Sequence, residues 1–250
     1  MIEIKNLNKK FNNNSVLKNL NINIEKGESA VVIGQSGTGK SVMLKCLLGL
    51  IKPDSGMIKI NNVSILDKNL SYSNKNRIKI GMLFQGGALF DSPPVWKNIS
   101  FISLQGKVSE KECKINALMT LEKVGLKSNI SDLYPSELSG GMQKRVALAR
   151  AIFSEPDIIL FDEPTTGLDP ITADVINNLI LEKVKDLGAT AITITHDMAS
   201  ARTIASKVYM LHDGAIIWGD DVSELEKTDN KFILQFTRGE SNGPISHRSN

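Results

Sequence analysis

The chain has 250 residues, of which 41% are hydrophobic and 23% charged, and its net charge is +3. That length can bury a sizeable core, and the charge is too mild to indicate nucleic acid or a strongly anionic surface as a partner. No apolar run approaches the roughly 18 residues that span a bilayer, and a strand pattern already begins at Ile2, so we expect a cytosolic protein without a signal peptide.

In chain order, an edge strand over residues 2–5 is followed by an asparagine-rich turn at 12–14. A helix is predicted from Lys40 to about Gly49, and a polar loop from Asp67 to Lys75. The other strands predicted in this half span residues 22–24, 29–33, 57–60, 63–65 and 78–84.

From Gly86 to about Ile152 helical periodicity dominates, which predicts a helical subdomain inserted between strands. One apolar helix face is expected to contain Ile115, Leu118, Met119, Leu121 and Val124. Strands at 157–161, 190–195, 207–211 and 215–218 follow, with helices at about 171–186 and 198–206. Alternating strands and helices predict an α/β fold with a largely parallel sheet.

Polar residues follow four of these strands, namely Gly34, Gln85, Asp162 and His196. Parallel sheets bind ligands beyond the carboxyl ends of their strands, so we expect these four residues to converge on one edge. Cys46 and Cys113 lack metal-ligand spacing and are expected to be buried or half-buried free thiols. The histidines, His196, His212 and His247, form no metal cluster in the sequence.

The most informative stretch runs from the apolar strand at Ala30–Ile33 into Gly34–Ser41. Its pattern, glycine-x-x-x-x-glycine-lysine-serine between a strand and a helix, predicts a phosphate-binding loop. Lys40 is expected to bridge the β- and γ-phosphates of a nucleotide, and the Ser41 hydroxyl to bind Mg²⁺. The residues predicted to hold the phosphates are Gly34, Ser36, Gly37, Thr38, Gly39, Lys40 and Ser41.

Three further features of the sequence each fit either a functional role or an ordinary structural one. Asp162 and Glu163 fit a Mg²⁺ ligand and a group that polarises the attacking water, or a solvated acidic turn. Phe11 fits a platform for a purine ring, or a core residue. Ser139, Gly140 and Gly141 open a second helix, which fits an anion-binding nest or a helix capped by Ser139.

Leu138–Gln143, about a hundred residues after Lys40, resembles the signature motif of ATP-binding cassette (ABC) ATPases. Phe11 matches the adenine-stacking aromatic, although tyrosine is commoner there. Gly34–Ser41 matches Walker A, Gln85 the Q-loop, residues 158–163 Walker B, Leu168-Asp169 the D-loop and His196 the switch histidine. The match covers about residues 1–220 and implies a P-loop NTPase cassette with an N-terminal antiparallel β element.

The resemblance also implies that the cofactors are ATP and Mg²⁺ and that two copies form a head-to-tail dimer. ATP on the Lys40 loop of one copy would be capped by Ser139, Gly140 and Gly141 of the other. His196 would contact the γ-phosphate, and Gln85 would bridge Mg²⁺ or water. Asp169 is carried over as a nucleotide-site residue.

Four stretches are similar to the Mla/Mce-associated ATPases, namely Gly86–Ser92, the Val95-x-x-Asn98-Ile99 pattern that follows it, Gly39–Lys45 and the tail from Gln235 to Ile245. That group drives phospholipid transport between bacterial inner and outer membranes. The resemblance implies a separate MlaE-like permease, a periplasmic lipid-binding protein and, in many members, a small cytosolic partner. It places the protein peripherally on the cytoplasmic side of the inner membrane.

Alternatives are an ABC ATPase energising another small-molecule importer, a soluble ABC protein acting on DNA or ribosomes, and a non-catalytic regulatory subunit. We expect an ATPase domain over residues 1–228 with its helical subdomain at about 86–152, and a tail over 229–250. In the tail, Phe232, Ile233 and Phe236 are expected to pack on a second subunit or partner, or to fold back on their own subunit.

Overall fold

The computed structural model describes residues 2–66, 78–106 and 108–245. The chain divides into two compact units. The first unit contains residues 1–75 and 194–250, and the second contains residues 76–193. The polar loop expected at 67–75 lies outside the described residues.

The first unit begins with an antiparallel sheet. β1 (Ile2–Phe11) and β2 (Asn14–Ile24) form a hairpin, and its predicted turn is present at Asn12, where φ is +51°. β4 (Ser55–Ile60) and β5 (Val63–Ser64) complete the order β2-β1-β4-β5.

The strand predicted at residues 2–5 is present, but its predicted position at an edge is wrong, because β1 is paired on both sides. The alternation of Ile2 and Ile4 correctly indicated one buried face. It carried no information about β4, which reaches β1 from some fifty residues further along the chain.

A second set of strands in the first unit positions the predicted phosphate loop. β3 (Ser29–Ile33) pairs in parallel with β9 (Lys207–His212), and β10 (Ala215–Asp221) pairs antiparallel with β9. Four of the five residues of β3, Ala30–Ile33, form an unbroken apolar run, and all four are fully buried. Its chain continues through the glycine-rich loop into α1 (Lys40–Leu47), and α7 (Met198–Ile204) precedes β9.

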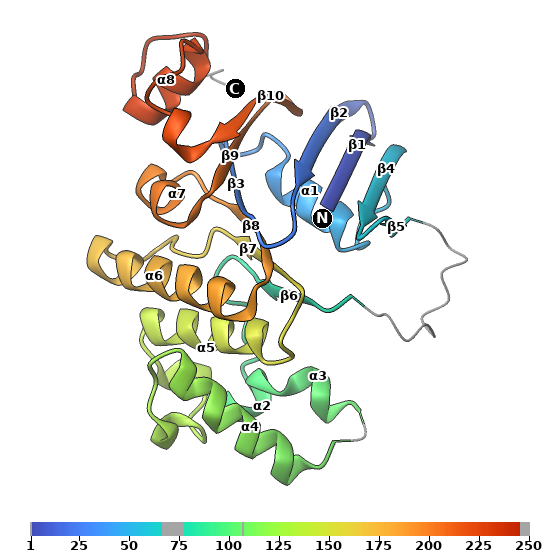
Figure 1. Ribbon diagram of the computed structural model, residues 1–250. Coiled ribbons are helices and arrows are strands. Elements are labelled where there is room, and N and C mark those ends of the chain that lie inside the picture. Colours follow the sequence, from blue (N-terminus) through green and yellow to red (C-terminus); the bar gives the residue numbers. More distant parts are fainter. Residues whose placement is uncertain (1, 67–77, 107, 246–250) are drawn as a thin grey trace. The chain divides into compact units, whose positions relative to one another are not determined.

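The C-terminal segment folds back on the first unit. After η3 (Val222–Glu224), α8 (Lys231–Arg238) forms the red helix near the C-terminus in Figure 1. Ile233 is fully buried, and the Phe232 ring lies 5.0 Å from the His212 ring. Phe232 and Ile233 therefore pack on their own subunit, which is one of the two arrangements expected for the tail.

The second unit combines parallel strands with helices. β6 (Ile80–Leu83) pairs in parallel with β7 (Ile158–Asp162), and β8 (Thr190–Ile194) follows on the other side of β7. α4 (Glu110–Lys123), α5 (Gly140–Ile152) and α6 (Pro170–Leu187) lie side by side (Figure 1). The shorter helices are α2 (Val95–Ile99), α3 (Phe101–Leu104), η1 (Ser128–Ile130) and η2 (Pro135–Glu137).

The expected apolar face of α4 is wrong in part. The buried positions are Cys113, Ala117, Thr120 and Leu121, with Val124 just after the helix. Ile115 and Met119 are instead exposed, 49% and 57% respectively, and lie one turn apart. The helix therefore buries the face that contains Cys113, Ala117 and Leu121, and Ile115 and Met119 form an apolar ridge towards solvent.

Two further findings concern expectations from composition. Cys46 and Cys113 are both buried and free, as predicted. Within the described ranges, no helix combines the length and the apolar character needed to cross a bilayer.

Candidate functional site

The loop from Gly34 to Ser41 leads into a helix that begins without a side-chain cap. Among the described residues, α4, α5 and α6 are capped by Ser109, Ser139 and Asp169, whereas no side chain caps α1. The first amides of a helix carry partial positive charge and need acceptors. An anion is the ligand that such a helix start accommodates best.

The glycines of this loop fit a phosphate cradle. At Gly34, where φ is +150°, an added Cβ would lie 2.3 Å from the Leu211 carbonyl oxygen. At Gly39, where φ is +105°, it would lie 2.8 Å from the Val16 carbonyl oxygen. Side chains at these positions would displace the loop, so the backbone itself forms the surface offered to an anion.

Lys40 is buried with its ammonium on the inner side of the loop. Its Nζ donates hydrogen bonds of 2.7 Å to the carbonyl oxygens of Gly34 and Gln35. Thr38 Oγ1 donates to the same Gln35 oxygen at 2.9 Å. The predicted lysine thus both shapes the loop and places a positive charge within it, and these residues fit a nucleotide triphosphate.

Two other predicted residues of the first unit are exposed. Phe11 at the end of β1 is 43% exposed, so it is not a core residue, and Lys9 Nζ lies 5.3 Å from its ring centroid. His196 follows β8, and the amide of its neighbour Thr195 donates to the Val32 carbonyl at 3.3 Å. Gly34 thus follows β3 of the first unit, and His196 follows β8, most of which belongs to the second unit.

In the second unit, Asp162 is the last residue of β7 and Glu163 follows it. Asp162 is 9% exposed, and the Glu163 carboxylate accepts a 3.0 Å hydrogen bond from Thr166 Oγ1. Glu163 has φ +50°, a left-handed conformation that is costly for a residue other than glycine. Such strain is characteristic of functional positions, which favours the catalytic interpretation over a solvated turn.

Gln85 lies beside these acids in the strand register. Leu83 of β6 pairs with Phe161 of β7, so Gln85 and Asp162 occur at the carboxyl ends of adjacent parallel strands. The Gln85 side chain is exposed. The amide oxygen of a glutamine and the carboxylate of an aspartate are both oxygen donors of the kind that Mg²⁺ prefers. Convergence of all four strand-end residues remains a prediction.

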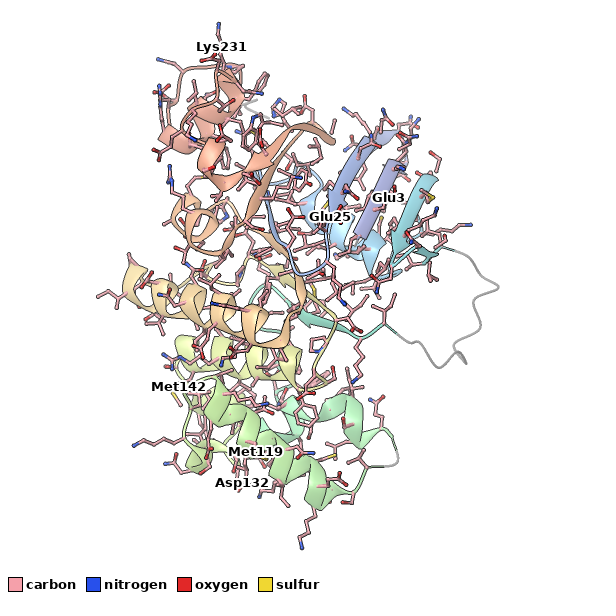
Figure 2. All side chains as sticks on the ribbon, viewed as in Figure 1. Glu3, Glu25, Met119, Asp132, Met142 and Lys231 are labelled. Atoms are coloured by element: carbon pink, nitrogen blue, oxygen red, sulfur yellow. The ribbon has the colours of Figure 1, made fainter. Side chains whose placement is uncertain are left out.

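Ser139 caps α5, which is one of the two roles that the sequence allowed for it. Its Oγ accepts from the Met142 amide at 3.3 Å, and Met142 is labelled in Figure 2. Ser139 and Gly140 are exposed. Gly141 is more constrained, because an added Cβ would lie 2.8 Å from Thr172 Cγ2 of α6. Close helix packing thus explains Gly141 without reference to a nucleotide.

Asp169 has a structural role that the motif did not indicate. It caps α6 by accepting hydrogen bonds from the amides of Ile171 and Thr172 and, at 2.6 Å, from Thr172 Oγ1. The bond from the Thr172 hydroxyl, with those from the two amides, lowers the pKa of the Asp169 carboxyl. Its role near a nucleotide remains a prediction.

Sequence reasoning missed two cationic residues on α5. Lys144 is 5% exposed and its Nζ has no hydrogen-bond partner among the described residues. Burial lowers the pKa of Lys144, and the negative charges of Glu163 and Asp162 oppose that shift. Arg150 binds the segment that follows Gln85. Both lie in helical sequence without a motif, so only their positions on the helix could have indicated them.

Within the described ranges, no cluster of three histidine, cysteine or acidic side chains could hold a metal ion.

The sequence matches a known protein family and is similar to characterised transport ATPases. The ABC transporter domain family matches residues 17–166. The intermembrane phospholipid transport system ATP-binding protein MlaF of Haemophilus influenzae is 38% identical over 246 residues, covering 98% of this chain and 93% of that protein. The glutamine transport ATP-binding protein GlnQ of Geobacillus stearothermophilus is 39% identical over 218 residues, covering 87% of this chain and 89% of that protein.

A solved structure extends the similarity to the fold. The dimeric, post-hydrolysis state of the ATP-binding cassette MJ0796 bound to ADP and Pi has a TM-score of 0.77 and 33% identity. The match covers 89% of this chain and 99% of that chain. Together with the antiparallel sheet of β1, β2, β4 and β5, this confirms the predicted fold class.

Proposed function

This chain belongs to the ABC transporter family and hydrolyses ATP as the ATPase subunit of a transporter, and from that premise we propose that it drives phospholipid transport between bacterial inner and outer membranes. The observation that carries the proposal is the extent of the similarity to MlaF. That match leaves only 2% of this chain unaligned, so it includes most of the C-terminal segment as well as the ATPase motifs.

We propose that Lys40 and the amides of its loop bind the phosphates of ATP and that Phe11 stacks on the base. Ser41, Gln85 and Asp162 are the residues that would hold Mg²⁺, which when bound neutralises charge on the phosphates. The Glu163 carboxylate accepts the proton of the attacking water, and His196 stabilises the charge developing on the γ-phosphoryl group.

We propose a homodimer in which each copy completes the site of the other. Ser139 and Gly140 are exposed at the start of α5, and the cassette MJ0796 was solved as a dimer. In the proposed arrangement these residues cap ATP bound by the partner copy. The proposal explains why one chain has two helix starts suited to phosphate, those of α1 and α5.

We propose that a separate, MlaE-like permease packs on the solvent-facing apolar ridge of the second unit. Ile115 and Met119, which form this ridge on α4, would otherwise contact water. A groove of about 330 Å³ lies beside Met119, which Figure 2 labels on α4. Apolar residues of this size beside a groove are typical of protein contacts. The chain would then lie on the cytoplasmic side of the inner membrane, and a periplasmic lipid-binding protein and a small cytosolic partner complete the assembly.

Docking can be tested separately from transport. A Met119→Glu substitution should reduce co-purification of the permease, because it places a charge in the proposed contact. Leu181→Glu on α6 is the matched control, since Leu181 is also an exposed apolar residue, 43% exposed, on a helix of the same unit. Equal loss in both variants would contradict this docking surface.

Amino-acid import is the second candidate, because GlnQ is 39% identical. The discriminating experiment reconstitutes the purified transporter in proteoliposomes and measures ATP-dependent transfer of a fluorescent phospholipid to the periplasmic lipid-binding protein. Transfer that is lost in a Glu163→Gln complex supports the proposal. Background transfer combined with ATP-dependent glutamine uptake would overturn it in favour of import.

A further inference from the structure

The turn that carries Gln85 is held in an unusual backbone conformation. The Gly87 amide donates to the Phe84 carbonyl at 2.8 Å, which closes the turn around Gln85. Gly86, Gly87 and Ala88 all have positive φ, of +75°, +82° and +45°. Ala88 adopts this conformation at an energetic cost, so contacts from elsewhere must stabilise the segment.

Arg150, in the last turn of α5, supplies such contacts. Its Nη2 donates to the Gly87 carbonyl at 2.6 Å, and its Nη1 donates to the Ala88 carbonyl at 2.7 Å. The guanidinium carbon lies 5.9 Å from the centroid of the Phe90 ring, which packs against Phe101. A planar guanidinium can bind two neighbouring carbonyls at once, which a lysine ammonium cannot do with the same geometry.

The segment is also held further along the chain. Asn98, fully buried, accepts from the Phe90 amide at 2.7 Å and donates to the carbonyls of Phe90 and Pro93. The residues between Gln85 and Pro94 therefore have fixed contacts at two places. Of these two contacts, the one made by Arg150 comes from α5, the helix that Ser139 caps.

α5 thus has Ser139 at one end and the tie to the Gln85 turn at the other. A helix of 13 residues is a stiff rod about 20 Å long, so a change in the direction of its first turn also moves its last turn. Resting on the proposed role of Gln85 above, we propose that Arg150 is a positioning residue that makes the placement of Gln85 depend on the orientation of the helix carrying Ser139, Gly140 and Gly141.

The test is a double-mutant cycle in the assembled transporter, with kcat and KM for ATP hydrolysis as readouts. Arg150→Lys keeps the charge but loses the paired geometry. We expect it to lower kcat about 5-fold with KM changed less than about 2-fold, and to have no further effect in a Gln85→Ala background. A role confined to stability would lower kcat by the same factor in both backgrounds.

Arg145→Lys is the matched control on the same helix. Arg145 also donates to backbone carbonyls, at 3.3 Å to Gly125 and 3.5 Å to Val124, but these lie in a different segment. Its effect should multiply with that of Gln85→Ala. If Arg150→Lys does not fold, Phe90→Leu replaces it, because this change weakens the stacking on the same guanidinium at a 43% exposed residue.

Two results would overturn the inference, for different reasons. Effects of Arg150→Lys and Gln85→Ala that multiply, in variants with unchanged unfolding temperatures, would show that Arg150 does not act through Gln85. Normal turnover of Gln85→Ala alone would instead remove the proposed role of Gln85, and the coupling with it.

Discussion

The Gln235 side chain binds the backbone of Ile245 on both sides. Its Oε1 accepts from the Ile245 amide at 2.7 Å, and its Nε2 donates to the Ile245 carbonyl at 3.1 Å. The same Nε2 donates to the Glu240 carbonyl at 3.1 Å. Gly243 passes so close that an added Cβ would lie 2.3 Å from Gln235 Oε1. One amide therefore fixes the return of the chain after α8.

Gln235→Ala should free residues 240–245 from their contacts with α8. Gln235 is 5% exposed and Ile245 4% exposed, so the substitution leaves buried backbone groups without partners, at a cost of about 1–3 kcal/mol. We expect faster hydrogen exchange at residues 240–245 and unchanged ATP hydrolysis. Thr237→Ala is the control, because Thr237 Oγ1 donates to the Leu234 carbonyl of its own helix rather than to residues 240–245. Exchange rates that match the wild type would show that Gln235 does not hold the segment.

Local sequence patterns predicted this protein well wherever short-range chemistry decides the structure. The end of β3 before Gly34 is where periodicity placed it, and the ends of β6 and β7 lie within one residue of the predicted ends at 84 and 161, because apolar runs followed by turn residues specify strand termini. The helix starts at Lys40 and Gly140 follow from glycine and serine chemistry in the same way.

Long-range contacts account for the failures. The second pairing of β1 depends on β4, and the exposure of Ile115 and Met119 depends on which neighbours pack against α4. The capping by Asp169 and the ties made by Arg150 and Gln235 are single side-chain contacts without periodicity. A pattern search has no signal for such contacts.

Gly141→Ala distinguishes packing from nucleotide contact. The new methyl would meet Thr172 Cγ2 at 2.8 Å, so we expect the free energy of unfolding to fall by about 1–3 kcal/mol. Thr172→Ser removes that methyl group but keeps the hydroxyl that bonds to Asp169. The double variant should therefore recover stability in urea unfolding. Failure of the serine to restore stability would refute the packing explanation.

Lys40→Ala should weaken ATP binding by removing both a positive charge and the bonds to the Gly34 and Gln35 carbonyls. Titration calorimetry with ATP measures the affinity directly. Lys45→Ala is the control, because Lys45 is an exposed lysine on the same helix. Unchanged affinity in Lys40→Ala would count against the phosphate-binding role.

Glu163→Gln should retain ATP binding but lower turnover at least ~10²-fold, because the amide cannot accept the proton of the attacking water. Glutamine keeps an acceptor for the Thr166 hydroxyl, so the fold should be preserved. Glu155→Gln controls for loss of an exposed negative charge in the same unit. Near-normal hydrolysis by Glu163→Gln would refute its role as the base.

Lys144→Met should change the pH dependence of stability. Burial lowers the pKa of Lys144 in the folded protein below its ordinary 10.5. Between the pKa of the folded protein and that of the unfolded chain, the unfolded chain therefore binds this proton more tightly than the folded protein does. In that interval a rise in pH stabilises the wild type, by at most about 1.4 kcal/mol per pH unit for one proton. The methionine variant lacks this contribution.

Urea unfolding of both proteins between about pH 7 and 10 measures the difference, with the pH limits set by the ordinary lysine pKa. The stability of Lys144→Met relative to the wild type should be greatest at the lower pH and should decline as the pH rises. Lys111→Met, at an exposed position on α4, controls for removal of a positive charge. A difference that stays constant with pH would show that Lys144 keeps its proton equally well in the folded and unfolded chain, despite the burial of its Nζ.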